Sequence, residues 1–188
     1  LIKYTFIFDF MIFSIIITTY NYEKYIRESV ESALNQDFSG EYEVIVIDDC
    51  STDGTSQILD SYNSLIRIHN KKNLSIEVSA NKAIRKANGK YIVRLDADDY
   101  LEGNFLSEAF KHIENENIFY YGDYTNVSEN GLHLSKINLI EFDRKEIKCR
   151  GDFLATGTIY SKKMLLGVGL YSEKIKNCGL ENYQLILN

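Results

Sequence analysis

The sequence of 188 residues contains no proline, and it has only three cysteines. Cys50, Cys149 and Cys178 are far apart and form no C-x-x-C pair, which excludes a disulfide framework and a zinc site and favours a reducing compartment. No internal repeat and no Pro/Gly/Ser-rich linker divides the chain. Because 45% of the residues are hydrophobic and 26% are charged, the composition is typical of one globular domain rather than of a disordered chain.

The chain also lacks a block of basic residues. It carries 21 Lys and Arg against 27 Asp and Glu, which gives a net charge of −6. This balance excludes a protein that binds the phosphate backbone of nucleic acids. If the ligand is an anion such as a nucleotide diphosphate, we expect an acidic protein to need a divalent cation to bind it.

A long hydrophobic run is missing as well. The apolar run from Tyr4 to Ile17 is interrupted by Asp9 and is short for a membrane span of about 20 residues. It has no small-residue cleavage site, which argues against a signal peptide. We therefore expect a leader over residues 1–12 and one domain over 13–188, with halves at 13–99 and 100–188. Because the sequence stops within an apparent helix, we expect a C-terminal truncation.

Short apolar runs alternate with segments of helical period, a pattern typical of a parallel sheet with helices on its faces. Beyond Asp123 the pattern changes to a hairpin around Asn130-Gly131 and a short helix. The predicted fold class is therefore α/β, with a mostly parallel central sheet and a smaller mixed zone. We expect strands at 13–18, 42–48, 65–70, 90–96 and 118–123, and helices at 23–36, 55–65, 77–87, 105–113 and 162–166.

Three polar sets fall where predicted strands end. They are "TTYN" at 18–21, "DDCSTDGT" at 48–55 and "DADD" at 96–99. In open parallel sheets, ligands bind at the carboxyl ends of the strands. If these three strands are neighbours, the three sets meet in one cleft.

The set "DDCSTDGT" has several interpretations. A calcium loop would need a Glu where Asp60 stands and a helix where a strand precedes it. An aspartyl-phosphatase loop would need a nucleophilic carboxylate where Ser51 stands. The favoured interpretation is that Asp53 caps the next helix and Gly54 supplies a permissive turn. Asp48 and Asp49 are adjacent at a strand end, so one can face the cleft while the other braces the loop.

The set "DADD" is the stronger chemical signal. Asp96 and Asp98 leave a strand two residues apart, so both side chains can point the same way. Carboxylate oxygens suit Mg²⁺ or Mn²⁺, which take one or two protein carboxylates and fill the remaining positions with phosphate and water. Together with the two other polar sets, this pattern favours a functional site over a solvated acidic turn.

The order of these motifs resembles the inverting, family 2 nucleotide-sugar glycosyltransferases with the GT-A fold, from about Phe13 to the chain end. The segments that carry the resemblance are "FSIIITTYNYEKYIRESVESALNQDF", "EVIVIDDCSTDGT", "NGKYIVRLDADD", "YYGDY" and "VGLYSEK". The resemblance implies a UDP-linked sugar donor, Mn²⁺ or Mg²⁺, and a carbohydrate or glycolipid acceptor in surface polysaccharide or glycolipid synthesis. A sugar-phosphate nucleotidyltransferase would need a glycine-rich loop, and "TTYNYEKY" contains no glycine.

The resemblance also implies roles for single residues. Thr18 and Tyr20 would line the nucleotide pocket, and Asp49 would hydrogen-bond the base. Asp96 would lie at the ribose and diphosphate and assist Asp98, the main metal ligand. Asp99 would shape the sugar end of the donor. The segment 153–161 would face the acceptor.

This sequence departs from the family pattern at several positions. The family usually has an acidic pair where Glu181 is followed by Asn182, and an amide cannot accept a proton, so Glu181 is the expected catalytic base. Ser75 stands where the family often has Gly, and Ala80 where Arg is frequent. The Asn182 departure leaves an alternative: a catalytically impaired nucleotide-sugar-binding module. The resemblance further implies a cytoplasmic protein, at the inner face of the membrane if C-terminal segments associate with it.

Overall fold

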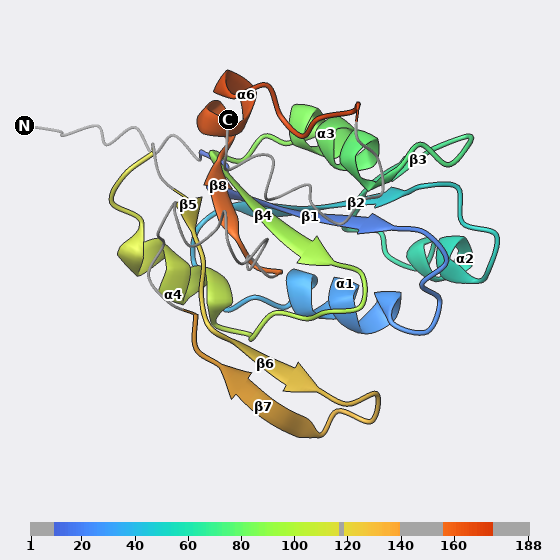
Figure 1. The fold of residues 1–188 in the computed structure, drawn as a ribbon, viewed down its shortest axis with the longest axis horizontal. Coiled ribbons are helices and arrows are strands. Elements are labelled where there is room, and N and C mark those ends of the chain that lie inside the picture. Colours follow the sequence, from blue (N-terminus) through green and yellow to red (C-terminus); the bar gives the residue numbers. More distant parts are fainter. Residues whose placement is uncertain (1–9, 117–118, 140–155, 175–188) are drawn as a thin grey trace, which may run out of the picture.

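The computed structural model describes residues 10–116, 119–139 and 156–174. A six-stranded sheet in the order β3-β2-β1-β4-β8-β5 forms its centre, with helices on both faces (Figure 1). The strands of this sheet are β1 (Phe13–Thr19), β2 (Tyr42–Asp48), β3 (Ile66–His69), β4 (Tyr91–Asp96), β5 (Phe119–Tyr120) and β8 (Ile159–Ser161). Strands β1 to β4 are parallel, and β8 is antiparallel to both β4 and β5. The predicted fold class is confirmed.

The helices alternate with the strands along the chain and cover both faces of the sheet. They are α1 (Ile26–Leu34), α2 (Thr55–Leu59), α3 (Ile76–Lys86), α4 (Phe105–His112) and α6 (Lys162–Gly167). In β1, Ile15 and Ile17 face the core layer under α1, α2 and α4, while Ile16 faces the layer under α3 and α6 (Figure 1). Since both faces are buried, the central strands are continuous apolar runs rather than alternating ones.

Helix α2 is shorter than predicted, because it ends at Leu59 rather than near residue 65. The Ser61 hydroxyl donates to the carbonyl oxygen of Ile58, and such side-chain bonds compete with helix continuation. Tyr62 and Leu65 still pack against the core. The spacing of the apolar residues therefore predicted correctly which of them are buried, but it overestimated the length of the helix.

Strand β8 was not predicted. Sequence analysis assigned its residues to a segment that faces the acceptor, but Ile159 and Tyr160 are buried between β4 and β5. The predicted hairpin is present as β6 (Tyr124–Val127) and β7 (His133–Ile137), which form a separate two-stranded sheet. In the described part of the chain, no helix is both long and apolar enough to cross a bilayer.

A polar clamp fixes the amino-terminal ends of the central strands. The buried carboxylate of Glu43 accepts hydrogen bonds from the Ser14 hydroxyl at 2.6 Å and from the Asn88 side chain at 3.0 Å. Gly89 donates its amide to Ser14 Oγ at 2.8 Å, and a Cβ on Gly89 would lie 2.5 Å from the Ser14 nitrogen. The glycine therefore permits β4 to begin directly beside β1.

Candidate functional site

The three polar sets lie at neighbouring strand ends. Thr19 is the register partner of Asp48, and Thr18 is the register partner of Asp96. Since β1 lies between β2 and β4, "TTYN", "DDCSTDGT" and "DADD" meet at one edge of the sheet. The three strands are therefore neighbours, as the predicted cleft required.

Hydrogen bonds join the loop after β1 to the loop after β2. Asn21 donates its amide to Ser51 Oγ at 2.9 Å, and its side-chain oxygen accepts from the Thr52 amide at 2.7 Å. Glu23 Oε2 accepts from the Gly54 amide at 2.6 Å. Asn21 has φ +61°, a left-handed conformation that asparagine tolerates better than most residues. These bonds make the first two polar sets one structural unit.

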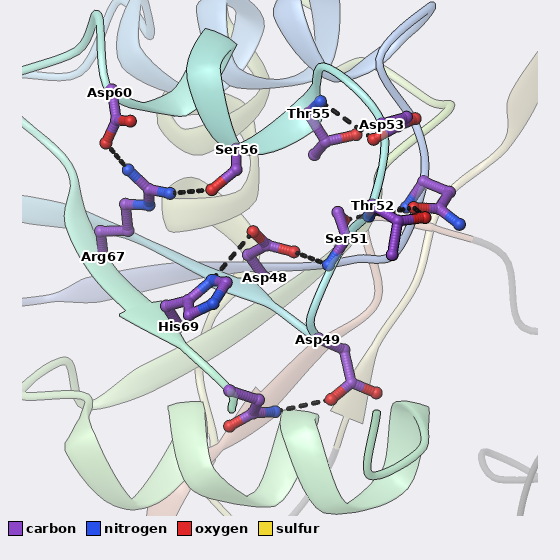
Figure 2. A network of polar contacts seen from close by, with 12 residues as sticks. Asp48, Asp49, Ser51, Thr52, Asp53, Thr55, Ser56, Asp60, Arg67 and His69 are labelled. Atoms are coloured by element: carbon purple, nitrogen blue, oxygen red, sulfur yellow. Dashed lines mark hydrogen bonds and ion pairs between the residues drawn. The ribbon is translucent and has the colours of Figure 1, made fainter. Parts of the chain in front are cut away.

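Asp53 supports the start of α2, but it is not the capping residue that was predicted, because the N-cap of α2 is Gly54 and has no side-chain cap hydrogen bond. Asp53 Oδ1 accepts from the Thr55 amide at 3.0 Å at the start of α2 (Figure 2). Its Oδ2 accepts from the Glu23 amide at 3.1 Å. Gly54 has φ −73°, which any residue can adopt. The interpretation of Gly54 as a permissive turn residue was therefore wrong. Its distinguishing feature is the close approach of Glu23.

Asp48 is fully buried and supports the loop from below. Its Oδ1 accepts from the Ser51 amide at 2.9 Å, and its Oδ2 lies 3.1 Å from His69 Nδ1 on β3 (Figure 2). Burial alone would raise the pKa of Asp48, but the hydrogen bonds from Ser51 and His69 outweigh burial and hold it below its usual value. Asp48 is therefore a charged brace between the loop and β3.

Asp49 points to the opposite side and is 4% exposed. Its carboxylate accepts from Asn70 Nδ2 at 2.7 Å and from the amides of Leu74 and Ser75 at 3.0 Å each. In this structure Asp49 thus holds the loop that leads into α3. Its role in base recognition stays a prediction.

Ser75 has an unusual backbone conformation. Its φ of +98° and ψ of +160° lie in a region that is essentially restricted to glycine. This strain explains why a glycine suits position 75, where the family often has Gly and this chain has Ser75. The Ser75 hydroxyl is buried and has no hydrogen-bond partner among the described residues.

The residues of "DADD" form a turn rather than a continuing strand. Strand β4 ends at Asp96, and the Asp99 amide donates to the Asp96 carbonyl at 3.2 Å. Ala97 is buried in the core, while Asp98 and Asp99 are exposed. The prediction that Asp96 and Asp98 share a side by strand alternation therefore used the wrong backbone geometry.

The turn nevertheless brings the three carboxylates together. Although Asp99 as a whole residue is exposed, its carboxyl group is partly buried. This burial and the negative charges of Asp96 and Asp98 raise the pKa of Asp99 to about 6, against a hydrogen bond from Thr156. Burial also raises the pKa of Tyr22, and the charges of Asp98, Asp96 and Asp99 add to this effect. Tyr22, which sequence analysis did not single out, thus lies close to the acidic turn.

Helix α1 fixes the acidic turn and the segment that follows it. Ser29 Oγ donates to the Asp96 carbonyl at 3.0 Å, and Ser32 Oγ accepts from the Leu101 amide at 3.1 Å. Gln36 donates to the Glu102 carbonyl at 3.0 Å and accepts from the Leu106 amide at 3.0 Å. Ser29 and Ser32 lie on α1, and Gln36 follows the end of the helix. The burial of Ser29 and Gln36 is unusual for polar residues and could have indicated this role.

The segment before β8 supports the acidic turn from the other side. Thr156 Oγ1 accepts from the Asp96 amide at 2.9 Å, and the Gly157 amide donates to the Arg94 carbonyl at 2.6 Å. Gly157 has φ +79°, which favours glycine. The side chain of Arg94 pairs with Asp96 at 3.0 Å. Thr156 was expected only as part of the segment that faces the acceptor, and Arg94 was not predicted, although an arginine within an apolar strand is a visible signal.

The remaining predicted residues divide by location. Thr18 is 8% exposed, and its hydroxyl is buried without a hydrogen-bond partner in the described part of the chain. Tyr20 is 43% exposed, so its ring is available to a ligand. Glu181, Asn182 and residues 153–155 lie outside the described residues.

The carboxylates of the acidic turn are the candidate metal ligands. Among residues 10–116, 119–139 and 156–174, no group of three His, Cys, Asp or Glu side chains is arranged to hold a metal. The turn therefore offers one or two carboxylates, the donor set that Mg²⁺ uses when substrate phosphates and water supply the other ligands. Asp98 and Asp96 fit this mode, and a structural cage of protein ligands is excluded for the described residues.

Known proteins are similar to this chain in sequence. The family model described as glycosyl transferase family 2 matches residues 14–166. The poly(ribitol-phosphate) beta-N-acetylglucosaminyltransferase TarS of Staphylococcus aureus is 39% identical over 112 residues, which are 55% of this chain and 19% of TarS. The putative teichuronic acid biosynthesis glycosyltransferase TuaG of Bacillus subtilis is 35% identical over 65% of this chain and 50% of its own length. The chain thus spans half or less of these relatives.

Solved structures agree with the family match. A crystal structure of S. aureus TarS 1–349 in complex with UDP-GlcNAc has a TM-score of 0.71 and 29% identity, and it covers 91% of this chain and 51% of that one. The mannosyltransferase PcManGT of Pyrobaculum calidifontis, in complex with GDP-Man and Mn²⁺, has a TM-score of 0.67 and 19% identity, with 92% and 50% covered. The fold is GT-A, and the chain belongs to glycosyltransferase family 2.

Proposed function

We propose that this protein transfers a sugar from a UDP-linked donor to a hydroxyl group of a carbohydrate or glycolipid acceptor, with inversion at the anomeric carbon, in surface polysaccharide synthesis. The observation that carries this proposal is the meeting of Thr18, Asp49 and Asp96 at three adjacent strand ends beside the "DADD" turn. Family membership and the UDP-GlcNAc complex of TarS support it. A cell-surface polymer as acceptor follows from the names of TarS and TuaG.

The donor site is built from residues with separate tasks. The buried Thr18 hydroxyl lacks a partner in the described structure and would hydrogen-bond the nucleotide, while the exposed ring of Tyr20 would stack on the base. Asp49 would accept a hydrogen bond from the base in addition to its bonds to the α3 loop. Asp99 would border the donor sugar.

We assign the divalent cation, Mn²⁺ or Mg²⁺, to Asp98 with Asp96 as the second carboxylate. When bound, such a cation offsets the negative charge that develops on the leaving diphosphate. Asp98 is exposed, so it can reach a ligand without displacing core atoms. The Asp96 main chain is fixed by Ser29 and Thr156, which orients the first carboxylate before any ligand arrives.

The transfer itself is one displacement. The acceptor oxygen forms a bond to the anomeric carbon as the bond to the diphosphate oxygen breaks on the opposite face, and a carboxylate takes the acceptor proton. Glu181 is the proposed base. Because Asn182 stands where the family has an acid, a nucleotide-sugar-binding module without turnover is the second candidate.

The experiment measures UDP binding and sugar transfer or donor hydrolysis with Mn²⁺, for the natural protein, Asp98→Asn and Asn182→Asp. We expect Asp98→Asn to lose Mn²⁺-dependent UDP binding, and unchanged binding would refute the metal assignment. If the natural protein binds UDP but turns it over only after Asn182→Asp, the second candidate replaces the first. A Glu181→Gln variant that keeps full activity would refute the base.

The proposed location is the cytoplasm, at the inner face of the membrane, where nucleotide sugars and a lipid-linked acceptor would both be available. Cell fractionation tests this proposal. Recovery of the natural protein from the culture medium would contradict it.

A further inference from the structure

Arg94 places a buried positive charge beside the acidic turn. Its side chain is 5% exposed, and Nη2 donates a 3.0 Å hydrogen bond to Asp96 Oδ1. The guanidinium also lies over the ring of the buried Tyr171, 5.5 Å from its centroid. A buried guanidinium is costly unless a carboxylate pairs with it, and Asp96 supplies one such carboxylate to Arg94 as well as being a site residue.

The backbone holds this pair in one orientation. Arg94 and Asp96 are two apart on β4, so their side chains leave the same face of the sheet. The Arg94 amide donates to the Thr158 carbonyl at 3.1 Å, and its carbonyl accepts from Gly157 at 2.6 Å. The Asp96 side chain is 42% exposed. One end of the pair is therefore fixed in the core, and the other end opens to the site.

This pairing changes what Asp96 can offer a ligand. Its Oδ1 is occupied by the guanidinium, which leaves Oδ2 as the oxygen with the greater freedom to bind a cation or a hydroxyl. The guanidinium also offsets one of the three negative charges of Asp96, Asp98 and Asp99. A cation is then attracted less strongly, and an anionic diphosphate is repelled less strongly, than by three uncompensated carboxylates.

We propose that Arg94 is a positioning residue of the donor site, which orients Asp96 through Oδ1 and shifts the balance of the acidic turn from cation binding toward diphosphate binding. This proposal rests on the proposed function only for the identity of the anion. It makes two predictions of opposite sign, and a residue that merely supports the fold would not produce them.

The test measures the binding of Mn²⁺ alone and of UDP alone, by calorimetry and by NMR titration, with no activity required. Arg94→Met removes the charge and the hydrogen bond, and Arg94→Gln removes the charge but keeps a donor for Asp96. We expect both variants to bind Mn²⁺ alone about three- to tenfold more tightly and UDP alone about three- to tenfold more weakly than the natural protein. Arg94→Lys, which keeps the charge, should bind Mn²⁺ like the natural protein.

Arg67→Met is the matched control, because Arg67 lies on the edge strand β3 and pairs with Asp60 and Ser56 at α2 (Figure 2). It should change neither affinity. If Arg94→Gln, with a native circular dichroism spectrum, binds Mn²⁺ equally or less tightly, the proposal is overturned. If UDP binds to no variant even with Mn²⁺ present, the proposed function fails, while the Mn²⁺ measurement still decides the role of Arg94.

Discussion

The Ser75 amide donates a 3.0 Å hydrogen bond to Asp49 Oδ2 from a backbone with φ +98°. The carboxylate at the end of β2 thus holds the start of α3 in a conformation that a side chain disfavours. The loop between β3 and α3 borders the site, and its shape depends on this contact. The strain at Ser75 and the buried carboxylate of Asp49 can be tested separately.

Ser75→Gly should stabilise the protein by about 1 kcal/mol, because relief of a strain on the order of 1–3 kcal/mol exceeds the cost of the greater freedom of glycine in the unfolded chain. Urea unfolding measures the effect. Ser75→Ala is the matched control, since it removes the hydroxyl but keeps the Cβ and the strain. Equal stabilisation by Ala and Gly would attribute the effect to the buried hydroxyl instead.

Asp49→Asn should destabilise the protein by about 1–3 kcal/mol, because an amide group cannot accept all the hydrogen bonds that Asn70, Leu74 and Ser75 donate. Thermal and urea unfolding measure the loss. Asp53→Asn is the control, since Asp53 is only partly buried while Asp49 is 4% exposed, and it should cost less. A fully stable Asp49→Asn variant with weakened UDP binding would give Asp49 a role in ligand binding alone.

The lowered pKa of Asp48 predicts how the stability of the protein depends on pH. Because its pKa in the folded protein is below the usual value, the ionised carboxylate stabilises the fold above the unfolded-state pKa of about 4. As the pH falls below that value, the unfolded chain takes up the proton first, so this stabilisation is lost progressively until the folded pKa is reached. Unfolding free energies of Asp48→Asn should therefore fall less between pH 5 and about pH 2 than those of the natural protein. Parallel curves would contradict the assignment.

Asp96→Asn should destabilise the protein more than Asp98→Asn does. The first change removes the carboxylate that accepts a 3.0 Å hydrogen bond from the buried guanidinium of Arg94, while Asp98 is exposed. We expect a loss of about 1–3 kcal/mol for Asp96→Asn and a change near zero for Asp98→Asn. Both variants should weaken Mn²⁺ binding, so the comparison separates structural from ligand-binding contributions. Equal stabilities would mean that the Arg94 pair adds nothing to the fold.

The sequence predicted the parts of this structure that depend on local periodicity. The strands β1 to β4 and the meeting of their polar ends follow from apolar runs and from the rule for parallel sheets. Strand β8 was missed because "IYS" is short, and its pairing with β4 is antiparallel and distant in the sequence. The predicted strand at 90–96 already placed Arg94 and Asp96 on one face, but the burial of the guanidinium against Tyr171 depends on a distant part of the chain.

Gly89 lies at the end of the sheet opposite the site, where β4 begins beside β1. A Cβ there would lie 2.5 Å from the Ser14 nitrogen and 2.6 Å from the Phe13 carbonyl carbon, and main-chain atoms of a central strand cannot move aside cheaply. Gly89→Ala should therefore cost about 1–3 kcal/mol, the typical cost of overpacking. Gly103→Ala is the matched control, because nothing lies within 4 Å of its Cβ position, and its stability should be close to that of the natural protein. Urea unfolding of the two variants compares the same chemical change in a crowded and an open position, so equal stabilities would show that β1 and β4 can separate at this end without cost.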